Sequence, residues 1–135
     1  MKQTDLKTLL KAQQGELDAV LMYNALAAKV KDKQDAETFR RLAAEEGRHA
    51  SVFRNLTHQA LKPKKTLSTL LPILYKILGK KLLYPIIAKA EYAAVNTYAP
   101  LAAIYPEVQS VKDDEKRHGD TVLALLKNKG GDLYG

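Results

Sequence analysis

Two short motifs of identical spacing combine a carboxylate with an imidazole, a pairing that can bind a metal ion. Glu46 is followed three residues later by His49, and Glu115 is followed three residues later by His118. Residues three apart lie on one face of an α-helix, so each motif directs its carboxylate and its imidazole the same way. Carboxylate and imidazole ligands together suit iron, manganese or zinc.

The apolar residues around each motif indicate that this face is buried. With steps of three and four, the apolar stripe continues through Phe39, Leu42, Phe53 and Leu56 around the first motif, and through Val108, Val111, Val122 and Leu125 around the second. The motifs therefore occupy positions where a helical bundle normally places Leu or Ile. An ionised carboxylate is strongly disfavoured in an apolar core unless it is paired or bound to a metal.

Two further acids lie on apolar stripes of other candidate helices. Glu16 belongs to a stripe from Leu6 to Val30 that includes Gln13, and Glu91 belongs to a stripe from Tyr84 to Leu101. None of the four stripes carries Lys or Arg, so no cation on them could neutralise the acids. We predict six ligands for two metal ions: Glu16, Glu46, His49, Glu91, Glu115 and His118. Four carboxylates and two imidazoles can neutralise most of the charge on two divalent ions.

Four long helices are expected to position these residues. The first should start near Thr4 or Asp5 and run to about Lys31, and a polar turn at 31–35 should fold the second back against it. The second should start after Asp35 and end before Pro63. Gly15, inside the first helix, suggests the close approach of a neighbouring helix.

Prolines suggest where the later helices lie. Pro85 fits the first turn of the third long helix, although its stripe could extend back to Tyr84, and Pro106 fits the first turn of the fourth. Pro100 should kink or loosen the end of the third helix. The fourth should end near Asn128.

The segment 66–85 is apolar but interrupted by Pro72 and Gly79. It is too short and too charged to span a membrane, so no stable membrane insertion is expected. We interpret it as a short helix within a long crossover between the second and third long helices. An amphipathic helix on a membrane surface is the alternative, and contact of residues 66–84 with a membrane or partner is left open.

Length and composition predict one domain, residues 1–135, with an apolar core. The absence of cysteine excludes disulfides, iron–sulfur clusters and thiolate zinc sites within these residues. The net charge of +7 is spread over helix faces, with a denser lysine group at 62–81, so we expect no nucleic-acid partner. Met1 leads directly into polar residues, and we expect a cytoplasmic protein without a signal peptide.

Residues beside the ligands suggest supporting roles. Glu45 and Asp114, each just before a ligand Glu, could orient a ligand His on an opposite helix, or could be ordinary exposed charges. We predict that Asp114 bonds to His49 and Glu45 to His118. Tyr23 and Tyr98, each seven residues after a ligand Glu, could fill the core with a hydroxyl bonded to a ligand carboxylate, and could also deliver protons or electrons.

The two halves of the chain repeat this pattern. Glu16, Tyr23 and the first motif match Glu91, Tyr98 and the second motif in order and type. We therefore expect a pseudo-twofold axis through the metal pair.

The chain resembles the rubrerythrin-type members of the ferritin-like superfamily. One Glu from each of two helices and one Glu-x-x-His from each of the other two is the known dinuclear ligand set of such bundles. The segments 45–49 and 114–118 are also similar to the (D/E)ExRH motif of bacterial di-iron oxygenases and to related rubrerythrin motifs. Many rubrerythrins carry an additional ligand Glu at the position that Ala94 occupies here. This chain therefore has a simpler six-ligand set.

The resemblance implies a ferritin-like antiparallel four-helix bundle that reduces hydrogen peroxide or dioxygen at a pair of iron ions. Manganese or zinc could replace the iron. The electrons would come from an external donor protein such as a rubredoxin, and related bundles suggest a homodimer. Residues 70–125 also resemble the ferritin-like domain attached to some bacterial vacuolar-iron-transporter-type proteins, which implies iron capture or delivery.

Three alternatives to a peroxidase use the same six residues. The first is a ferroxidase or iron-binding module, for which Fe(II) is the substrate. The second is a non-enzymatic interaction protein stabilised by an inert zinc-filled site. The third is an oxygenase that hydroxylates an organic substrate in an apolar pocket beside the metals. The native metal, the electron donor and the oligomeric state do not follow from the spacing.

Overall fold

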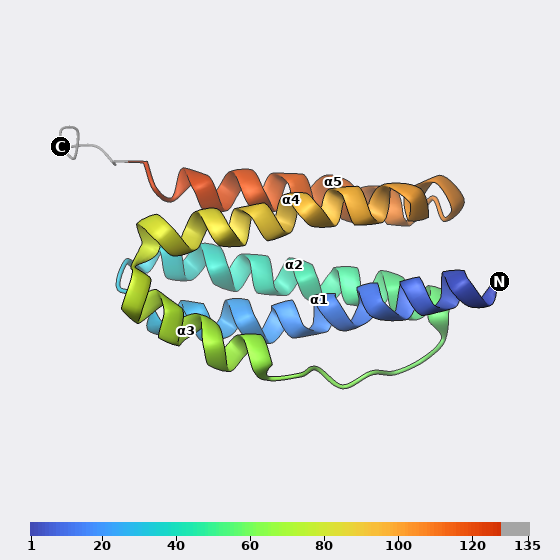
Figure 1. Cartoon of the computed structure of the whole chain (residues 1–135), viewed down its shortest axis with the longest axis horizontal. Helices are drawn as coiled ribbons and strands as arrows, with labels where there is room; N and C mark the ends of the chain where they lie inside the picture. The colour runs from blue at the N-terminus through green and yellow to red at the C-terminus, as the bar shows by residue number, and fades with distance from the viewer. Residues whose placement is uncertain (128–135) are drawn as a thin grey trace. The chain divides into compact units, whose positions relative to one another are not determined.

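The computed structural model describes residues 1–127, and all regular structure in that range is α-helical. The helices follow one another as α1 (Gln3–Lys29), α2 (Lys33–Thr57), α3 (Thr66–Leu78), α4 (Lys80–Ile104) and α5 (Val108–Ala124) (Figure 1). The all-α prediction is confirmed, and so is the short extra helix, α3, in the crossover. The predicted end of the last helix near Asn128 lies outside the described residues.

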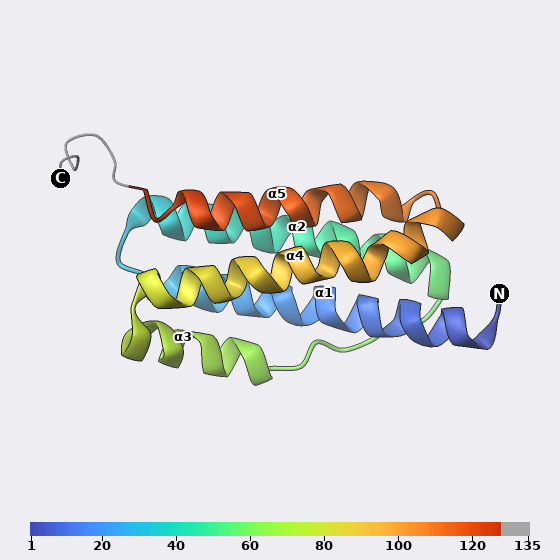
Figure 2. The same cartoon turned by 45° about the horizontal axis from the view of Figure 1, so that its top comes forward.

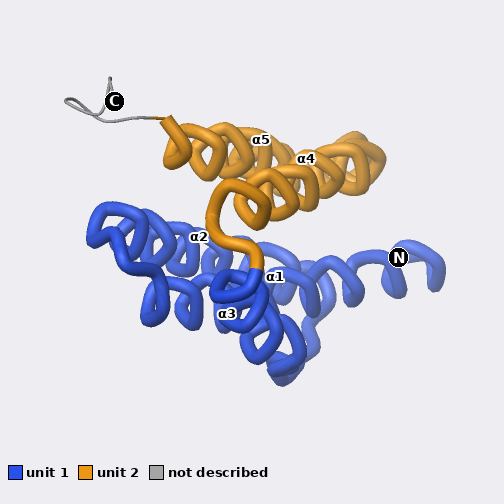
Figure 3. Tube along the Cα trace, turned by 60° about the vertical axis from the view of Figure 1, so that its left-hand side comes forward, with its two compact units in different colours: residues 1–77 blue, residues 78–135 orange. Residues whose placement is uncertain are grey.

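The chain divides into two compact units, residues 1–77 and residues 78–135 (Figure 3). The first unit contains α1, α2 and nearly all of α3, and the second contains α4 and α5. Within each unit two long helices pack along one another, α1 with α2 and α4 with α5 (Figure 2). A single domain spanning residues 1–135 stays a prediction.

The turn between α1 and α2 is shorter than predicted because Asp32 caps α2. Its Oδ1 accepts hydrogen bonds from the backbone N–H groups of Gln34, at 2.8 Å, and Asp35, at 3.1 Å. A carboxylate that satisfies two free amides starts a helix at the next residue. The predicted start after Asp35 is therefore wrong.

Thr4 and Asp5, near which α1 was predicted to start and either of which could have capped it, both lie inside the helix. This helix begins at Gln3, and the residue before it, Lys2, makes no side-chain capping bond. The helix ends at Lys29, two residues before the predicted end.

Hydrogen bonds from α1 hold the crossover segment that follows α2. The helix ends at Thr57, and His58 follows in the left-handed backbone region at φ 58°. Gln14 Nε2 then donates to the carbonyl oxygen of Lys62 at 2.8 Å, and Asp18 Oδ1 accepts from the backbone N–H of Lys64 at 2.7 Å. These bonds satisfy backbone groups of a segment that has no regular structure of its own.

Helix α3 continues through Pro72. The helical path breaks instead at Gly79, whose φ of 76° favours glycine. The hydroxyl of Tyr75 accepts a bond from the backbone N–H of Lys31 at 3.3 Å, which connects α3 to the end of α1. Within the described residues, no helix is both long and apolar enough to cross a membrane.

Helix α4 starts five residues before Pro85 and places this proline in its interior, contrary to the prediction. The break at Gly79 decides the start, and the Gly79 carbonyl already accepts from the Leu83 N–H at 3.1 Å. Pro85 and Pro100 are both exposed, so water can solvate the carbonyls that lose an internal donor. Helix α5 starts at Val108, after a turn that contains the predicted first residue Pro106.

The predicted apolar stripes form the core of each unit. Leu9, Leu26, Phe39, Leu42 and Phe53 are fully buried in the first unit, as are Leu83, Tyr84, Val108, Val111 and Val122 in the second. Tyr23 of α1 stacks on Phe39 of α2, with the ring centroids 5.7 Å apart. These contacts hold each helix pair in the register that the ligand residues require.

Gly119 allows the Tyr92 side chain to lie close against the backbone of α5. A Cβ atom built on Gly119 of α5 would lie 2.4 to 2.8 Å from ring atoms of Tyr92 on α4. The Tyr92 hydroxyl donates to Asp120 Oδ1 at 2.6 Å, which fixes the ring across α5. Gly15, by contrast, is exposed and has nothing near its missing Cβ, so the close approach predicted there is wrong.

We predict opposite effects of alanine at these two glycines. Gly119→Ala should lower the free energy of unfolding by about 1–2 kcal/mol, because the added methyl group displaces the Tyr92 ring. Gly15→Ala should raise it by about 1 kcal/mol, since alanine is the better helix former and fits without contact. Urea unfolding of the metal-free protein measures both. In a Tyr92→Ala background, Gly119→Ala should become stabilising; a loss of stability there would contradict this explanation.

Candidate metal centre

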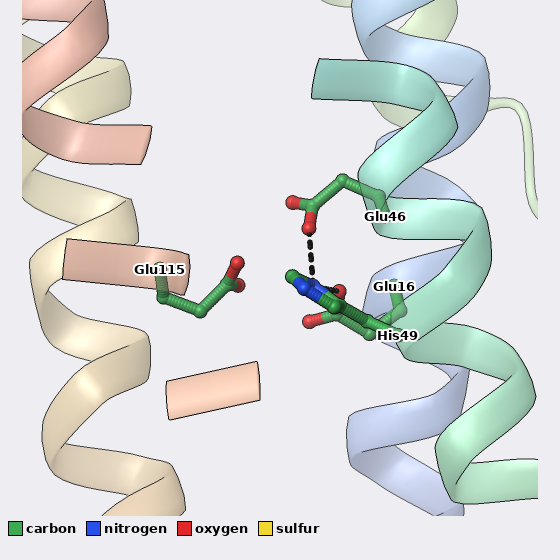
Figure 4. A group of neighbouring side chains, drawn as sticks. All are labelled: Glu16, Glu46, His49 and Glu115. Carbon is green, nitrogen blue, oxygen red and sulfur yellow. Dashed lines mark hydrogen bonds and ion pairs between the residues drawn. The ribbon is translucent and has the colours of Figure 1, made fainter. Parts of the chain in front are cut away.

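The first unit gathers two carboxylates and one imidazole from two helices. His49 Nδ1 on α2 lies 2.8 Å from Glu46 Oε1 on the same helix and 3.0 Å from Glu16 Oε1 on α1 (Figure 4). All three residues are buried, with 2–3% of their surface exposed. We call them the first cluster.

The second unit repeats this arrangement with Glu91 from α4 and Glu115 and His118 from α5, the second cluster. His118 Nδ1 lies 3.1 Å from Glu115 Oε1 and 3.7 Å from Glu91 Oε2. His118 is fully buried, and both carboxylates are buried as well. The internal repeat seen in the sequence is thus matched by the geometry within each unit. The pseudo-twofold axis concerns the placement of the units and stays a prediction.

The local sequence explains why these polar groups face inward. Each motif is embedded in a stripe whose other members are fully buried, such as Phe39 and Phe53 on α2 and Val111 and Val122 on α5. Turning either motif to solvent would expose those residues, at about 1.5–3 kcal/mol for each side chain. The apolar residues therefore hold the ligands in the core.

Each cluster contains more carboxyl groups than imidazoles, so it is negatively charged when its glutamates are ionised. Two glutamates and one imidazole sum to −1 even when the imidazole is protonated, and to −2 when it is neutral. No lysine or arginine among residues 1–127 is buried. A bound cation would offset this charge, since an excess of ionised carboxylates is unfavourable in an apolar interior.

The distances within each cluster suit a shared ion. Metal–ligand bonds of about 2.1 Å place neighbouring ligand atoms of one ion roughly 3 Å apart. The observed contacts run from 2.8 to 3.7 Å, and one ligand atom from each residue of a cluster lies within 4.8 Å of the others. In both clusters the imidazole nitrogen that faces the carboxylates is Nδ1.

The two proposed orienting acids differ in their surroundings. Glu45 is buried, with 8% of its surface exposed. Asp114 is half-buried, and its Oδ1 accepts from Arg117 Nη2 on the same helix at 3.0 Å. The contacts expected between Asp114 and His49, and between Glu45 and His118, join the two units and stay predictions.

Both tyrosines that follow a ligand Glu lie in the core. Tyr23 has 1% of its surface exposed and Tyr98 has 5%. This burial agrees with the packing role, which the Tyr23–Phe39 stack shows directly. A part in proton or electron delivery stays a prediction.

Sequence reasoning gave no role to a buried polar network one turn from Glu16. Gln13 has 1% of its surface exposed; its Oε1 accepts from Thr57 Oγ1 at 2.7 Å, and its Nε2 donates to the Gln59 carbonyl at 2.8 Å. This network fixes the end of α2 against α1. The available signal was the polar Gln13 inside an otherwise apolar stripe.

A second missed group lies beside the second cluster. Tyr92 directly follows Glu91, and Asp120 comes two residues after His118. The hydrogen bond between them raises the pKa of the Tyr92 hydroxyl and, with help from Lys116 at 3.0 Å, lowers the pKa of the Asp120 carboxyl. The bond connects α4 and α5 at the level of the ligands. The sequence signal was Gly119 in the middle of a helix.

These features define a class of protein, a ferritin-like all-α protein with buried carboxylate–histidine clusters that could hold metal. The family model of rubrerythrin matches residues 7–126. The chain belongs to the rubrerythrin family, and the resemblance seen in its motifs is confirmed. No curated protein and no solved structure matches the chain.

Glu46 and Glu115 are predicted to be essential for metal binding. Replacing either with Ala should greatly reduce the metal bound per chain, because each substitution removes a buried carboxylate oxygen that faces a ligand imidazole. Elemental analysis of folded, desalted protein measures the occupancy. Glu37→Ala is the matched control, since Glu37 lies on α2 but is exposed. Undiminished binding of two metal ions by both variants would rule out this ligand set.

Asp114→Asn tests the proposed orienting acid. If Asp114 positions a ligand imidazole, the variant should bind metal roughly 10- to 100-fold more weakly, because loss of the carboxylate lowers the basicity of the imidazole. Competition with a chelator of known affinity measures the change. Asp113→Asn is the control, since the neighbouring Asp113 is exposed and accepts a hydrogen bond from Gln109 on the same helix. Equal affinities of the two variants would remove the role assigned to Asp114.

Proposed function

We propose that this chain is a di-iron oxidoreductase that reduces hydrogen peroxide, or dioxygen, with electrons from an external donor. The observation that carries the proposal is the buried, repeated set of two carboxylates and one imidazole in each unit. Membership of the rubrerythrin family supports iron as the metal.

The proposal joins the two clusters into one dinuclear site. Glu16, Glu46 and His49 would hold one ion, and Glu91, Glu115 and His118 would hold the other. The support for joining them is the ligand inventory, one Glu from each of two helices and one Glu-x-x-His from each of the other two. A pair of Fe(II) ions held by these residues would supply two electrons, which with two protons would convert hydrogen peroxide to two molecules of water.

The charge of the four carboxylates favours retention of the metal. Together they carry −4, which balances two Fe(II) ions and attracts two Fe(III) ions still more strongly. Burial of all four carboxylates reduces screening by water. A site of this kind can keep its ions through repeated oxidation and reduction, which a peroxidase requires. A ferroxidase, by contrast, must release its Fe(III).

Protons and electrons have separate proposed sources. Tyr23 and Tyr98 are buried, and each lies two turns from a ligand Glu on the same helix face, so their hydroxyls are candidates to pass protons to the site. The chain contains no cysteine with which to build a thiolate iron centre. We propose that a donor outside these residues, such as a protein of the rubredoxin type, supplies the electrons.

The sharpest test compares two oxidants. Protein loaded anaerobically with two Fe(II) ions per chain should be oxidised faster by hydrogen peroxide than by dioxygen, and both irons should stay bound. Stopped-flow absorbance measures the oxidation, and elemental analysis after desalting measures the retained iron. The exposed variant Glu37→Ala serves as a control that should behave like the unmodified chain.

The opposite pattern identifies the iron-handling alternative. Fast oxidation by dioxygen, followed by uptake of many further Fe(II) ions per chain, would overturn the peroxidase proposal and favour a ferroxidase. Tight binding of zinc with no oxidation by either reagent after iron loading would favour the non-enzymatic interaction protein.

A further inference from the structure

Helix α3 presents an apolar stripe to solvent, although Leu71 of the same helix is buried. Leu70, Ile73 and Ile77 follow one another at steps of three and four, and their exposed fractions are 43%, 51% and 71%. Leu71, which points to a different side of the helix, has only 6% of its surface exposed. The helix therefore has a second apolar face that the described fold leaves uncovered.

The part of the sequence that contains this stripe is strongly basic. Residues 47–90 contain nine lysines and arginines and no aspartate or glutamate. Lys62, Lys64 and Lys65 precede α3 directly, Lys76 lies within it, and all four are exposed. An apolar stripe bordered by exposed lysines has the chemistry of a helix that lies at the surface of an anionic membrane.

We propose that α3 binds the surface of a membrane rich in anionic phospholipids, with the stripe Leu70–Ile73–Ile77 entering the boundary between headgroups and acyl chains. The proposal does not depend on the metal clusters. At 13 residues α3 is about 20 Å long, shorter than the roughly 30 Å hydrocarbon core of a bilayer. It can therefore lie in the interface but cannot span the bilayer.

Charge complementarity favours lipid over a second copy of the chain. Two copies that met through this face would bring their lysines together with no acid between residues 47 and 90 to offset them. An anionic lipid surface instead attracts each lysine, and the long lysine stems can lie along the apolar stripe while their ammonium groups reach the phosphates. The first turns of α4 share this composition, with Leu82 and Ile86 exposed and Lys80 and Lys81 nearby in sequence.

A tryptophan placed in the stripe gives a local readout, because the chain contains none of its own. The fluorescence of full-length Ile77→Trp should shift to shorter wavelength when vesicles of phosphatidylcholine with phosphatidylglycerol are added, and should not shift with phosphatidylcholine alone. Ile104→Trp is the matched control, because Ile104 is 56% exposed at the far end of α4. Its emission should stay unchanged, or shift much less.

Vesicle co-sedimentation then assigns the binding to the stripe and the lysines. Ile73→Gln with Ile77→Gln should weaken binding by tenfold or more, and Lys64→Gln with Lys65→Gln by roughly tenfold or more. Lys2→Gln with Lys7→Gln removes the same charge elsewhere and should have a smaller effect. All altered residues are exposed, so the fold should be preserved, which circular dichroism checks.

Each contrary result rejects the proposal. These are equal binding to neutral and anionic vesicles, no binding to either, or binding unchanged by both stripe variants. Sedimentation equilibrium without lipid distinguishes the other occupant. The unmodified chain could instead form a dimer and fail to bind vesicles. If the double variant Ile73→Gln with Ile77→Gln then dissociated that dimer, the stripe would be assigned to a second copy of the chain.

Discussion

The burial of ionisable groups within apolar helix stripes is the constraint on which the rest of this protein depends. Four glutamates and two histidines occupy positions that leucine or isoleucine would fill in a simpler helical protein. Removing a carboxylate from water is unfavourable unless the folded state supplies compensating charge or hydrogen bonds. The surrounding core must therefore hold these groups in place firmly enough to resist their tendency to reach water.

Each unit meets this requirement with packing and a few specific polar bonds. In the first unit, fully buried residues such as Phe39 and Phe53 flank the ligands on α2, and Gln13 fixes the end of that helix. In the second, the Tyr92–Asp120 bond connects α4 and α5 beside the ligands, and Gly119 leaves the space that the tyrosine ring needs. The two units thus hold equivalent clusters with different supporting contacts, as expected where the ligands are constrained more tightly than their surroundings.

The distribution of charge separates two possible functions of the chain. The glutamates of the clusters face inward, where they could bind cations, whereas the lysines around α3 face outward beside exposed apolar residues. The first arrangement is suited to redox chemistry with a metal, and the second to an anionic surface. A helix that joins two hairpins is free to take such a second role, because its apolar stripe is not needed for the core of either hairpin.

The sequence by itself determined the helical class, the presence of the crossover helix, and which residues face inward. Glu46 and His49 are separated from Phe39 and Phe53 by steps of three and four, so all four residues lie on one helix face. Because the phenylalanines of that face are apolar, burial of the ligands followed from periodicity alone. The rubrerythrin resemblance followed from the same spacing, because the type and order of the ligand residues are visible in a linear chain.

Only the three-dimensional structure decided the features that depend on distances between helices or on local backbone geometry. It showed that Nδ1 of both histidines faces the carboxylates, that Asp32 and not Asp35 starts α2, and that Pro85 lies inside α4. Gly15 and Gly119 look alike in sequence, yet one faces solvent and the other meets the ring of Tyr92. A glycine has no side chain to reveal its neighbour, and a capping bond depends on local backbone geometry, so neither could be read from periodicity.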